Sequence, residues 1–296
     1  MSQPSRPDPS TPAELPATEP ATTAGLAALA AEALRVDGTP PFSDQALVEA
    51  RSGEARVVGD MDALAIVRPG EAELVVRPEM RRRGLGTRIL RSVVDSTTGD
   101  LAVWAHGDHP GAARLAAEFG FAPVRRLLQQ RAAIARDAPA PALPEGAVLR
   151  SFRPGADDSA WLDLNARAFA DHAEQGSLGQ RDLDARKADD WFDADDFLLL
   201  WKSDEPGAAL LAFCWLKVVE GEPGEFYAVG VAPEHQGEHL GGVVVDAGLA
   251  RLAARGLTTA ALYVEGDNAA ALRLYAARGF TDHAVDVQYL ISRSLG

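Results

Sequence analysis

The sequence predicts an α/β protein made of two copies of one domain, each a mixed (α+β) sheet covered by helices. The chain of 296 residues has room for about two domains of ordinary size. Its two halves resemble each other, and strand-like and helix-like segments alternate within each half. A proline-rich stretch at 137–146 looks like a linker, so we expect an N-terminal domain at 22–136 and a C-terminal domain at 147–296.

The N-terminal end differs from the rest in composition. The first twenty residues hold six prolines among Ser, Thr, Ala and Glu. Such a segment has too few apolar side chains to offset the entropy lost on ordering, so we expect a disordered tail over 1–21. Order should begin near Thr22 or Thr23, good N-caps for an Ala- and Leu-rich helix that stops at Gly38.

The second half shows the alternation of elements in full. Strands are expected near 147–152, 196–202, 208–218, 224–231, 258–265 and 284–291. Helices are expected near 158–170, 180–192, 239–255 and 268–278.

The repeat is visible in two blocks of sequence. A β-rich run ending near a proline, a glycine loop and a helix-like stretch occur at 71–94 and again at 226–252, shifted by 155 residues. Gly120-Phe121 recurs as Gly279-Phe280, shifted by 159 residues. A repeat array would need three or more short units, so the pattern indicates a duplicated domain.

Composition excludes several classes of function. Asp plus Glu number 43 and Lys plus Arg 29, a net charge of -14, so the chain lacks the basic surface that nucleic acids or anionic membranes require. The single cysteine, Cys214, excludes a disulfide framework and a Cys-rich zinc site, and the scattered histidines predict no metal. No apolar run approaches the roughly 20 residues that span a bilayer. We expect a monomeric cytoplasmic protein.

An acidic protein can still hold an anion in a local site. The loop Arg81-x-x-Gly84-x-Gly86 lies between a strand and a helix. Its glycines let the backbone approach an anion, and free N–H groups of the loop and helix N-terminus point at it. By spacing alone the loop could also be only a tight turn.

Both halves resemble GNAT acetyltransferase domains, whose acetyl-CoA loop has the form [Gln/Arg]-x-x-Gly-x-[Gly/Ala]. The second half is similar to one tandem-domain branch of that superfamily, the mycothiol synthases (mycothiol acetyltransferases). The segments that carry this resemblance are Phe169–Gly176, Asp190–Asp193, Phe213–Lys217, Gly224–Pro233, Leu262–Asn268, Tyr275 and Gly279-Phe280. The resemblance covers nearly all of 22–291.

The resemblance implies acetyl transfer from acetyl-CoA to the cysteinyl amine of desacetylmycothiol, a cysteinyl-glucosamine-inositol, as the last step of mycothiol biosynthesis. The amine must lose a proton, and Glu225 fits the position of the base. The tetrahedral oxyanion needs a backbone donor, which the family takes from Val229–Val231. Tyr275 fits the position of the acid that assists the departing thiolate.

The resemblance also implies binding residues. Acetyl-CoA contacts in the second half would come from Val229, Gly230, Val231, Gln236, Gly237, Glu238, His239, Leu240, Gly241, Gly242, Asn268, Ala269, Ala270, Ala271, Leu272 and Arg273. The matching contacts in the first half would come from Leu74, Val75, Val76, Arg81, Arg82, Arg83, Gly84, Leu85 and Gly86. Substrate contacts would come from Asp44, Glu174, Lys217, Glu225 and Tyr263.

The duplication supplies an internal comparison. Subtracting the offsets places Gly70 at the position of Glu225 (225 − 155) and Ala116 at that of Tyr275 (275 − 159), although Glu71 and Glu73 lie close by. We therefore expect a catalytic second half and a non-catalytic first half.

The acetyl-CoA loop of the second half departs from the family pattern. It has His239 where the pattern has its first glycine, and Glu238 adds a negative charge near the expected pyrophosphate. We expect a weaker or shifted grip on the phosphates.

Other interpretations stay open at this point. Glu225 could be a solvated carboxylate at a strand end, and Tyr275 could be a core residue with its hydroxyl at the surface. The whole chain could be another small-molecule amine acetyltransferase of this fold, or a non-catalytic acyl-CoA-binding sensor.

Overall fold

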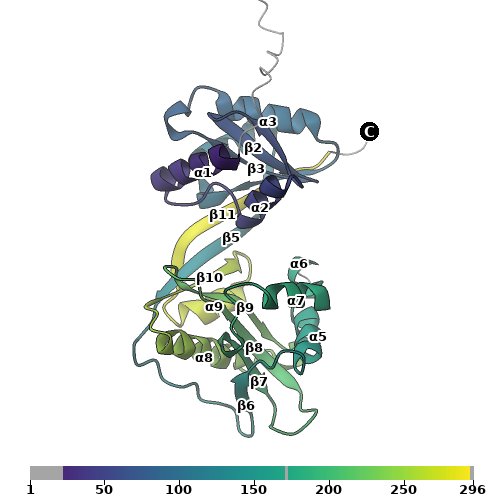
Figure 1. Ribbon diagram of the computed structural model, residues 1–296, viewed down its shortest axis with the longest axis vertical. Coiled ribbons are helices and arrows are strands. Elements are labelled where there is room, and N and C mark those ends of the chain that lie inside the picture. The colour runs from purple at the N-terminus through teal and green to yellow at the C-terminus, as the bar shows by residue number, and fades with distance from the viewer. Residues whose placement is uncertain (1–22, 171–172, 294–296) are drawn as a thin grey trace, which may run out of the picture. The chain divides into compact units, whose positions relative to one another are not determined.

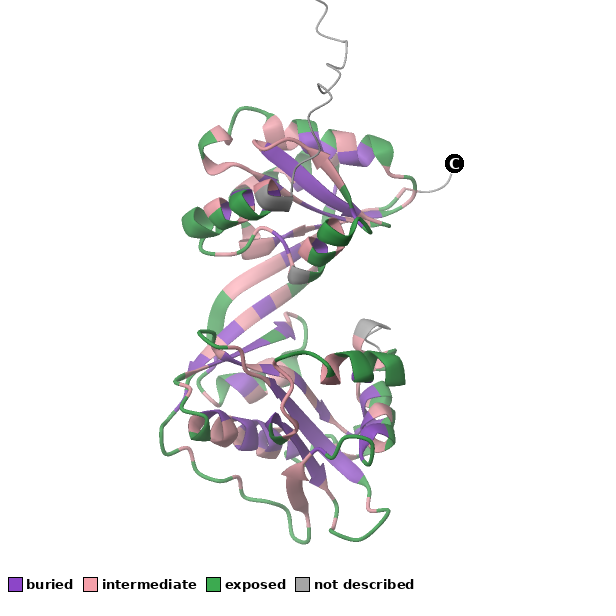
Figure 2. Ribbon diagram, in the orientation of Figure 1, coloured by how far each residue is buried: buried purple, intermediate pink, exposed green. Residues whose placement is uncertain are grey.

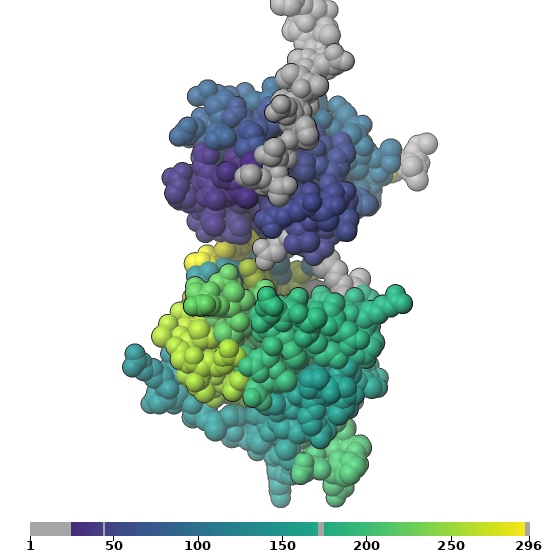
Figure 3. All heavy atoms as spheres, in the orientation of Figure 1, coloured from purple at the N-terminus to yellow at the C-terminus, as the bar shows by residue number. Residues whose placement is uncertain are grey.

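The computed structural model describes residues 23–170 and 173–293, so the tail predicted at 1–21 lies outside the described residues. The chain forms two compact units (Figure 1). The first contains residues up to Arg126 together with those from Ala284 onwards, and the second contains Leu127–His283. In Figure 3, purple to blue atoms cover the first unit and mainly teal to yellow atoms cover the second.

The first unit has a mixed sheet in the order β1-β2-β3-β4-β11. Only the β3–β4 pair is parallel. Its strands are β1 (Arg56–Gly59), β2 (Ala63–Arg68), β3 (Glu71–Val76), β4 (Leu101–Ala105) and most of β11 (Thr281–Ile291), and its helices are α1 (Thr23–Asp37), α2 (Asp44–Ser52), α3 (Leu85–Ser96) and α4 (Pro110–Phe119). The helix predicted to start at Thr22 or Thr23 is confirmed as α1.

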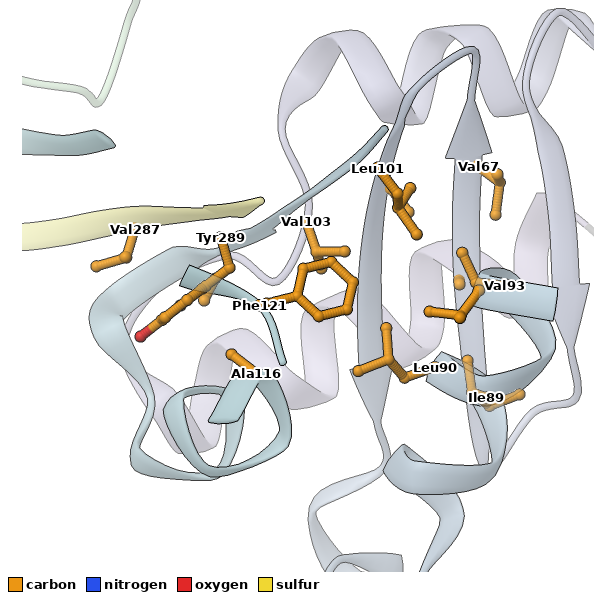
Figure 4. Packing of buried hydrophobic residues seen from close by; sticks show 14 of the residues in the cluster. Val67, Ile89, Leu90, Val93, Leu101, Val103, Ala116, Phe121, Val287 and Tyr289 are labelled. Atoms are coloured by element: carbon orange, nitrogen blue, oxygen red, sulfur yellow. The ribbon is translucent and has the colours of Figure 1, made fainter. Parts of the chain in front are cut away.

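Helices cover both faces of this sheet, as the burial of β2 shows. Ala63, Ala65 and Val67 pack in one cluster with residues of α3 and α4 (Figure 4). Leu64 and Ile66, which point to the other face, pack with residues of α1 and α2. A strand buried on both sides is expected to be continuously apolar, which explains the run at 63–67.

The second unit has a mixed sheet in the order β6-β7-β8-β9-β10-β5. Its strands are most of β5 (Ala122–Ala133), β6 (Val148–Ser151), β7 (Phe197–Trp201), β8 (Leu210–Lys217), β9 (Gly224–Val231) and β10 (Thr259–Glu265), and its helices are α5 (Asp158–Ala168), α6 (Ala173–Gly176), α7 (Gln180–Lys187), α8 (Leu240–Ala254) and α9 (Ala269–Ala276). Each element predicted in the second half of the sequence is present, with the helix predicted at 180–192 ending at Lys187 and the strand predicted at 284–291 lying in the part of β11 that belongs to the first unit.

The last strand of each repeat ends in the other unit. The boundary between units falls inside β5, after Arg126, and inside β11, before Ala284. β5 pairs with β10 through Leu127–Ala133, and β11 pairs with β4 through Val287–Ile291, both antiparallel. The sheet of each unit is therefore paired, at this edge, with the last strand of the other repeat. The stretch predicted as a linker, 137–146, connects β5 to β6 within the second unit.

Aromatic side chains fill the core of the second unit. Trp215 of β8 stacks on Phe197 at 4.4 Å between ring centroids, and Trp161 of α5 meets Trp215 edge-on at 5.4 Å. Figure 2 shows buried residues along the central strands and exposed ones on the outer sides of the helices.

Cys214 is fully buried in this unit, and burial raises the pKa of its thiol. Within the described ranges, no helix is long and apolar enough to cross a membrane.

Candidate active site

Two residues predicted to face the substrate, Lys217 and Glu225, lie opposite each other on β8 and β9. Directly opposed residues of antiparallel strands project from the same face, with Cβ atoms about 5 Å apart. The register shifts between Trp215 and Leu216, which makes Tyr227 an extra residue on β9. Bulges of this kind often occur beside active sites because they redirect side chains.

β9 and β10 part a short distance beyond Glu225. Their parallel pairing covers only residues 224–226 of β9 and 260–262 of β10. In the residues of β9 that follow, every second peptide group points away from β8. These groups face the side on which β10 is no longer paired with β9. These residues include Val229–Val231, predicted to supply the oxyanion donor. The equivalent strands of the first unit, β3 and β4, also pair over three residues, 71–73 with 102–104.

The two predicted acetyl-CoA loops share one backbone conformation despite different sequences. In the first loop, Arg82 and Gly84 are left-handed, with φ of 58° and 80°. In the second, the matching residues Gly237 and His239 are left-handed, with φ of 86° and 62°. Each loop therefore has one glycine and one side-chain-bearing residue at these positions, in opposite order. His239 occupies the place of the pattern's first glycine without changing the shape of the loop.

This conformation gives His239→Gly a predictable effect. A left-handed conformation costs a residue with a side chain roughly 1–2 kcal/mol, and the greater unfolded-state freedom of glycine offsets part of the gain. We expect a net stabilisation of about 1 kcal/mol, or about 2–4 °C in Tm, measured by calorimetry. Arg82→Gly is the matched variant in the first loop and should also stabilise. A lower Tm for His239→Gly would contradict the strain argument.

The last glycine of each predicted motif lies close to a leucine side chain of the helix that follows. A Cβ on Gly86 would lie 2.9 Å from Leu115, and one on Gly241 would lie 3.2 Å from Leu274. The first distance is shorter than real Cβ atoms show, and the second is tighter than nine in ten real Cβ contacts, although in both cases the neighbour is the end of a flexible side chain. These glycines let α3 and α8 approach the helix that follows in each unit.

The charged side chains differ between the loops. Arg81 forms a bidentate ion pair with Asp37, at 2.6 and 2.7 Å, and also donates to the Val76 carbonyl. Arg82 and Arg83 are exposed. In the second loop, the imidazole Nδ1 of His235 lies 3.2 Å from the carboxylate of Glu238. The first loop thus presents two exposed arginines, whereas the second has Gly237 and Glu238 at the matching places.

Tyr275 lies on α9 and is 8% exposed. Its ring packs against Phe280, which in turn meets Phe226 of β9. Burial, with a smaller effect from Cys214, raises the pKa of the phenol, so Tyr275 keeps its proton at neutral pH. The ring is a core residue, as the simpler interpretation held, and its hydroxyl is in the form that an acid requires.

Tyr263 is 47% exposed on β10, and its hydroxyl accepts a hydrogen bond from Gln129 Nε2 at 2.7 Å. Gln129 lies opposite it on β5. No pattern in the sequence points to Gln129, because β5 precedes the predicted linker and its residues lie in the predicted first domain.

The first unit lacks an available base at the matching place. Gly70 stands where the second unit has Glu225. The nearby Glu73 is 1% exposed and accepts hydrogen bonds from Ser43 and Arg68, while His106 lies 3.3 Å away. Because Glu73 makes these contacts within the protein, it is not available as a base.

The remaining predicted substrate residues are Asp44, the first residue of α2, and Glu174 of α6, whose side chains lie outside what the structure describes. Asn165 Nδ2 of α5 donates a hydrogen bond to the backbone carbonyl of Gln175 in α6, and Gln175 Nε2 donates one to Asn165 Oδ1. In the described part of the chain, no group of three or more His, Cys, Asp or Glu side chains could hold a metal ion.

Each of the two units has two parallel strands that part beside a glycine loop, and the loop leads into the N-terminus of a helix. This arrangement, present twice, defines a tandem acetyltransferase of the GNAT class. Residues 160–280 match the Acetyltransferase (GNAT) family. The mycothiol acetyltransferase of Thermobispora bispora is 46% identical over 279 residues, covering 88% of this chain and 93% of the relative. That of Sanguibacter keddieii is 44% identical over 301 residues, covering 92% and 94%. The chain belongs to the mycothiol acetyltransferase family.

Solved structures agree with this fold. A GCN5-related N-acetyltransferase from Sphaerobacter thermophilus superposes with a TM-score of 0.69 at 21% identity, covering 94% of this chain and 96% of that one. A tandem GNAT protein from the clavulanic acid biosynthesis pathway gives 0.66 at 17% identity, covering 93% and 96%. At these identities the likeness concerns the fold alone.

Proposed function

We propose that the second unit transfers the acetyl group of acetyl-CoA to the cysteinyl amine of desacetylmycothiol, giving mycothiol and CoA. The proposal rests on the placement of Glu225 opposite Lys217, beside the point where β9 and β10 part. Gly70 in the first unit removes the carboxylate from the equivalent place. Membership of the mycothiol acetyltransferase family supports the identity of the acceptor.

In the proposed reaction, Glu225 accepts a proton from the substrate ammonium, directly or through water. The freed nitrogen lone pair forms a bond to the acetyl carbon, and the oxyanion accepts a hydrogen bond from a backbone N–H within Val229–Val231. Collapse of this intermediate breaks the carbon–sulfur bond, and the Tyr275 hydroxyl donates its proton to the CoA sulfur. The nitrogen then loses its second proton, which returns through water to the Tyr275 phenolate. Tyr275 is protonated at neutral pH and can donate, but burial raises its pKa and so makes it a weaker acid than an exposed tyrosine.

The binding residues follow the same proposal. The pyrophosphate of acetyl-CoA would meet backbone N–H groups at the N-terminus of α8, with further contacts from Asn268–Arg273. Lys217, Tyr263 and Glu174 would contact hydroxyl groups of the sugar and inositol. The predicted contact of Asp44 stays a prediction. We also propose that the protein acts as a cytoplasmic monomer.

The deciding experiment combines the protein with acetyl-CoA and desacetylmycothiol, following thiol release and product mass. A thiol released for each acetylated acceptor is the expected result. Acetylation of polyamines or aminoglycosides with no reaction on desacetylmycothiol would instead identify another amine acetyltransferase. Acetyl-CoA binding without turnover on any amine would identify a sensor.

Tyr275→Phe tests the acid. We expect kcat to fall by about 10²-fold, the lower end of the range for general acid catalysis. The loss should be modest because a thiol with a pKa near 8.5 leaves readily as the thiolate. Since the Tyr275 ring is a core residue, circular dichroism should show an unchanged fold. Turnover close to that of the wild type would remove Tyr275 from the mechanism.

A further inference from the structure

Trp191 follows α7 and contacts three side chains near the proposed acceptor site. Its ring centroid lies 5.1 Å from that of Tyr227 and 5.8 Å from that of Trp215. The ammonium nitrogen of Lys217 lies over the Trp191 ring, 5.8 Å from the centroid. The segment Asp190–Asp193 carries part of the resemblance to the family, but that resemblance implies no role for Trp191.

We propose that Trp191 is a positioning residue, which holds the Lys217 ammonium over its ring and so sets the affinity of the second unit for its acceptor. The inference rests on the proposed function, in which Lys217 contacts the acceptor. Trp191 would act through Lys217 and take no part in proton transfer.

The chemistry of lysine explains why such a residue is needed. A lysine side chain loses up to about 2 kcal/mol of rotamer entropy when it is fixed. The face of an indole attracts an ammonium group through the quadrupole of its ring. Lys217 is the last residue of β8, where strand pairing ends, so contacts of the side chain must hold its far end. Trp191 provides such a contact without neutralising the charge.

The Trp191 ring is itself fixed. Trp215, behind it, is fully buried. Tyr227 is the extra residue of the bulge on β9, and its hydroxyl accepts a hydrogen bond from Arg186 Nε on α7. The bulge therefore brings Tyr227 against Trp191, on the face of the sheet where Lys217 and Glu225 project.

Steady-state kinetics separate positioning from general damage. For Trp191→Leu, we expect KM for desacetylmycothiol to rise about threefold to thirtyfold, the range that a cation–π contact supplies, with kcat and KM for acetyl-CoA unchanged. Trp191→Phe keeps an aromatic face and should recover much of the affinity. Phe192→Leu is the matched control, since Phe192 also contacts Trp215 and should leave the acceptor KM unchanged.

A double-mutant cycle tests whether Trp191 acts through Lys217. Lys217→Met should raise the acceptor KM by itself, and adding Trp191→Leu should raise it no further. Independent, additive effects of the two substitutions would overturn the inference.

A measurement without the acceptor keeps the inference testable if the proposed function fails. The chain has three lysines, Lys187, Lys202 and Lys217, whose modification by acetic anhydride is followed by mass spectrometry. Trp191→Leu should speed modification of Lys217 at least about twofold relative to the exposed Lys202. Lys187, ion-paired with Asp158, should not change. An unchanged rate at Lys217 would overturn the inference, whereas absence of wild-type turnover would overturn the proposed function alone.

Discussion

Replacing Glu225 by glutamine is expected to lower kcat for desacetylmycothiol by about 10²–10⁴-fold, the range for loss of a general base. Glutamine has the same shape and cannot accept a proton at neutral pH. Acetyl-CoA affinity, measured by calorimetry, should be retained because the predicted loops are separate from Glu225. The stability should change by about 1 kcal/mol or less, since Glu225 is only half-buried.

The pH dependence of the variant gives a second test. Without a base, the reaction depends on the fraction of substrate that arrives as the free amine, which rises tenfold per pH unit below a pKa of about 8. The residual activity of Glu225→Gln should rise accordingly between pH 6 and pH 8. Glu222→Gln, in the exposed turn before β9, is the matched control and should behave as wild type. A kcat within about threefold of wild type would exclude Glu225 as the base.

The elements of the fold could be predicted from the sequence, but the pairing of the last strands could not. Periodicity, glycines and prolines are local, and they locate β9, α8 and the repeat itself. Strand pairing is decided by which edge a strand meets. Because β5 and β11 are equivalent strands of a duplicated domain, no local feature distinguishes pairing within a repeat from pairing across it.

Prediction of the site had a similar limit. Comparison of the two copies of the domain points to Glu225 and Tyr275, because at each of these positions the side chain differs between the copies. It treated His239 as a departure, whereas the loop keeps its shape by exchanging the order of glycine and side chain. Gln129 and Trp191 carried no sequence signal of a role, since each contacts a predicted site residue only through tertiary structure.

A buried charge cluster in the first unit should make its stability depend on pH. His106, at the end of β4, has Nδ1 3.0 Å from Asp286 and Nε2 3.3 Å from Glu73. Glu73 also accepts hydrogen bonds from the backbone and hydroxyl of Ser43 and from Arg68, and Gly107 N–H donates to Asp286.

The two carboxylates determine the charge of His106. Burial alone would lower its pKa, but hydrogen bonds to Asp286 and Glu73, with their negative charges, raise it from 6.5 to about 9. The same contacts outweigh burial at Glu73 and lower the pKa of that carboxyl. The cluster therefore holds an imidazolium between two carboxylates at neutral pH.

The sign of the effect follows from proton linkage. Below pH 6.5 the folded and unfolded states both bind the proton, and the full stabilisation of about 3 kcal/mol is present. Between pH 6.5 and about 9 the unfolded chain releases its proton while the folded chain keeps it, so stability falls by up to about 1.4 kcal/mol per pH unit. Above pH 9 this contribution is lost.

His106→Gln isolates this contribution, because a difference between two proteins cancels the other titrating groups. The unfolding free energy, from urea titrations, should be lower for the variant, and the gap should shrink by about 3 kcal/mol between pH 6 and pH 10. Trp104, stacked on His106, is the single tryptophan of the first unit. The four tryptophans of the second unit are replaced by phenylalanine in both proteins, so that the fluorescence of Trp104 follows the unfolding of the first unit. His283→Gln, at an exposed position, should show no such change. A gap independent of pH would mean that the pKa of His106 is the same in the folded and unfolded states, so that Glu73 and Asp286 do not stabilise its charged form.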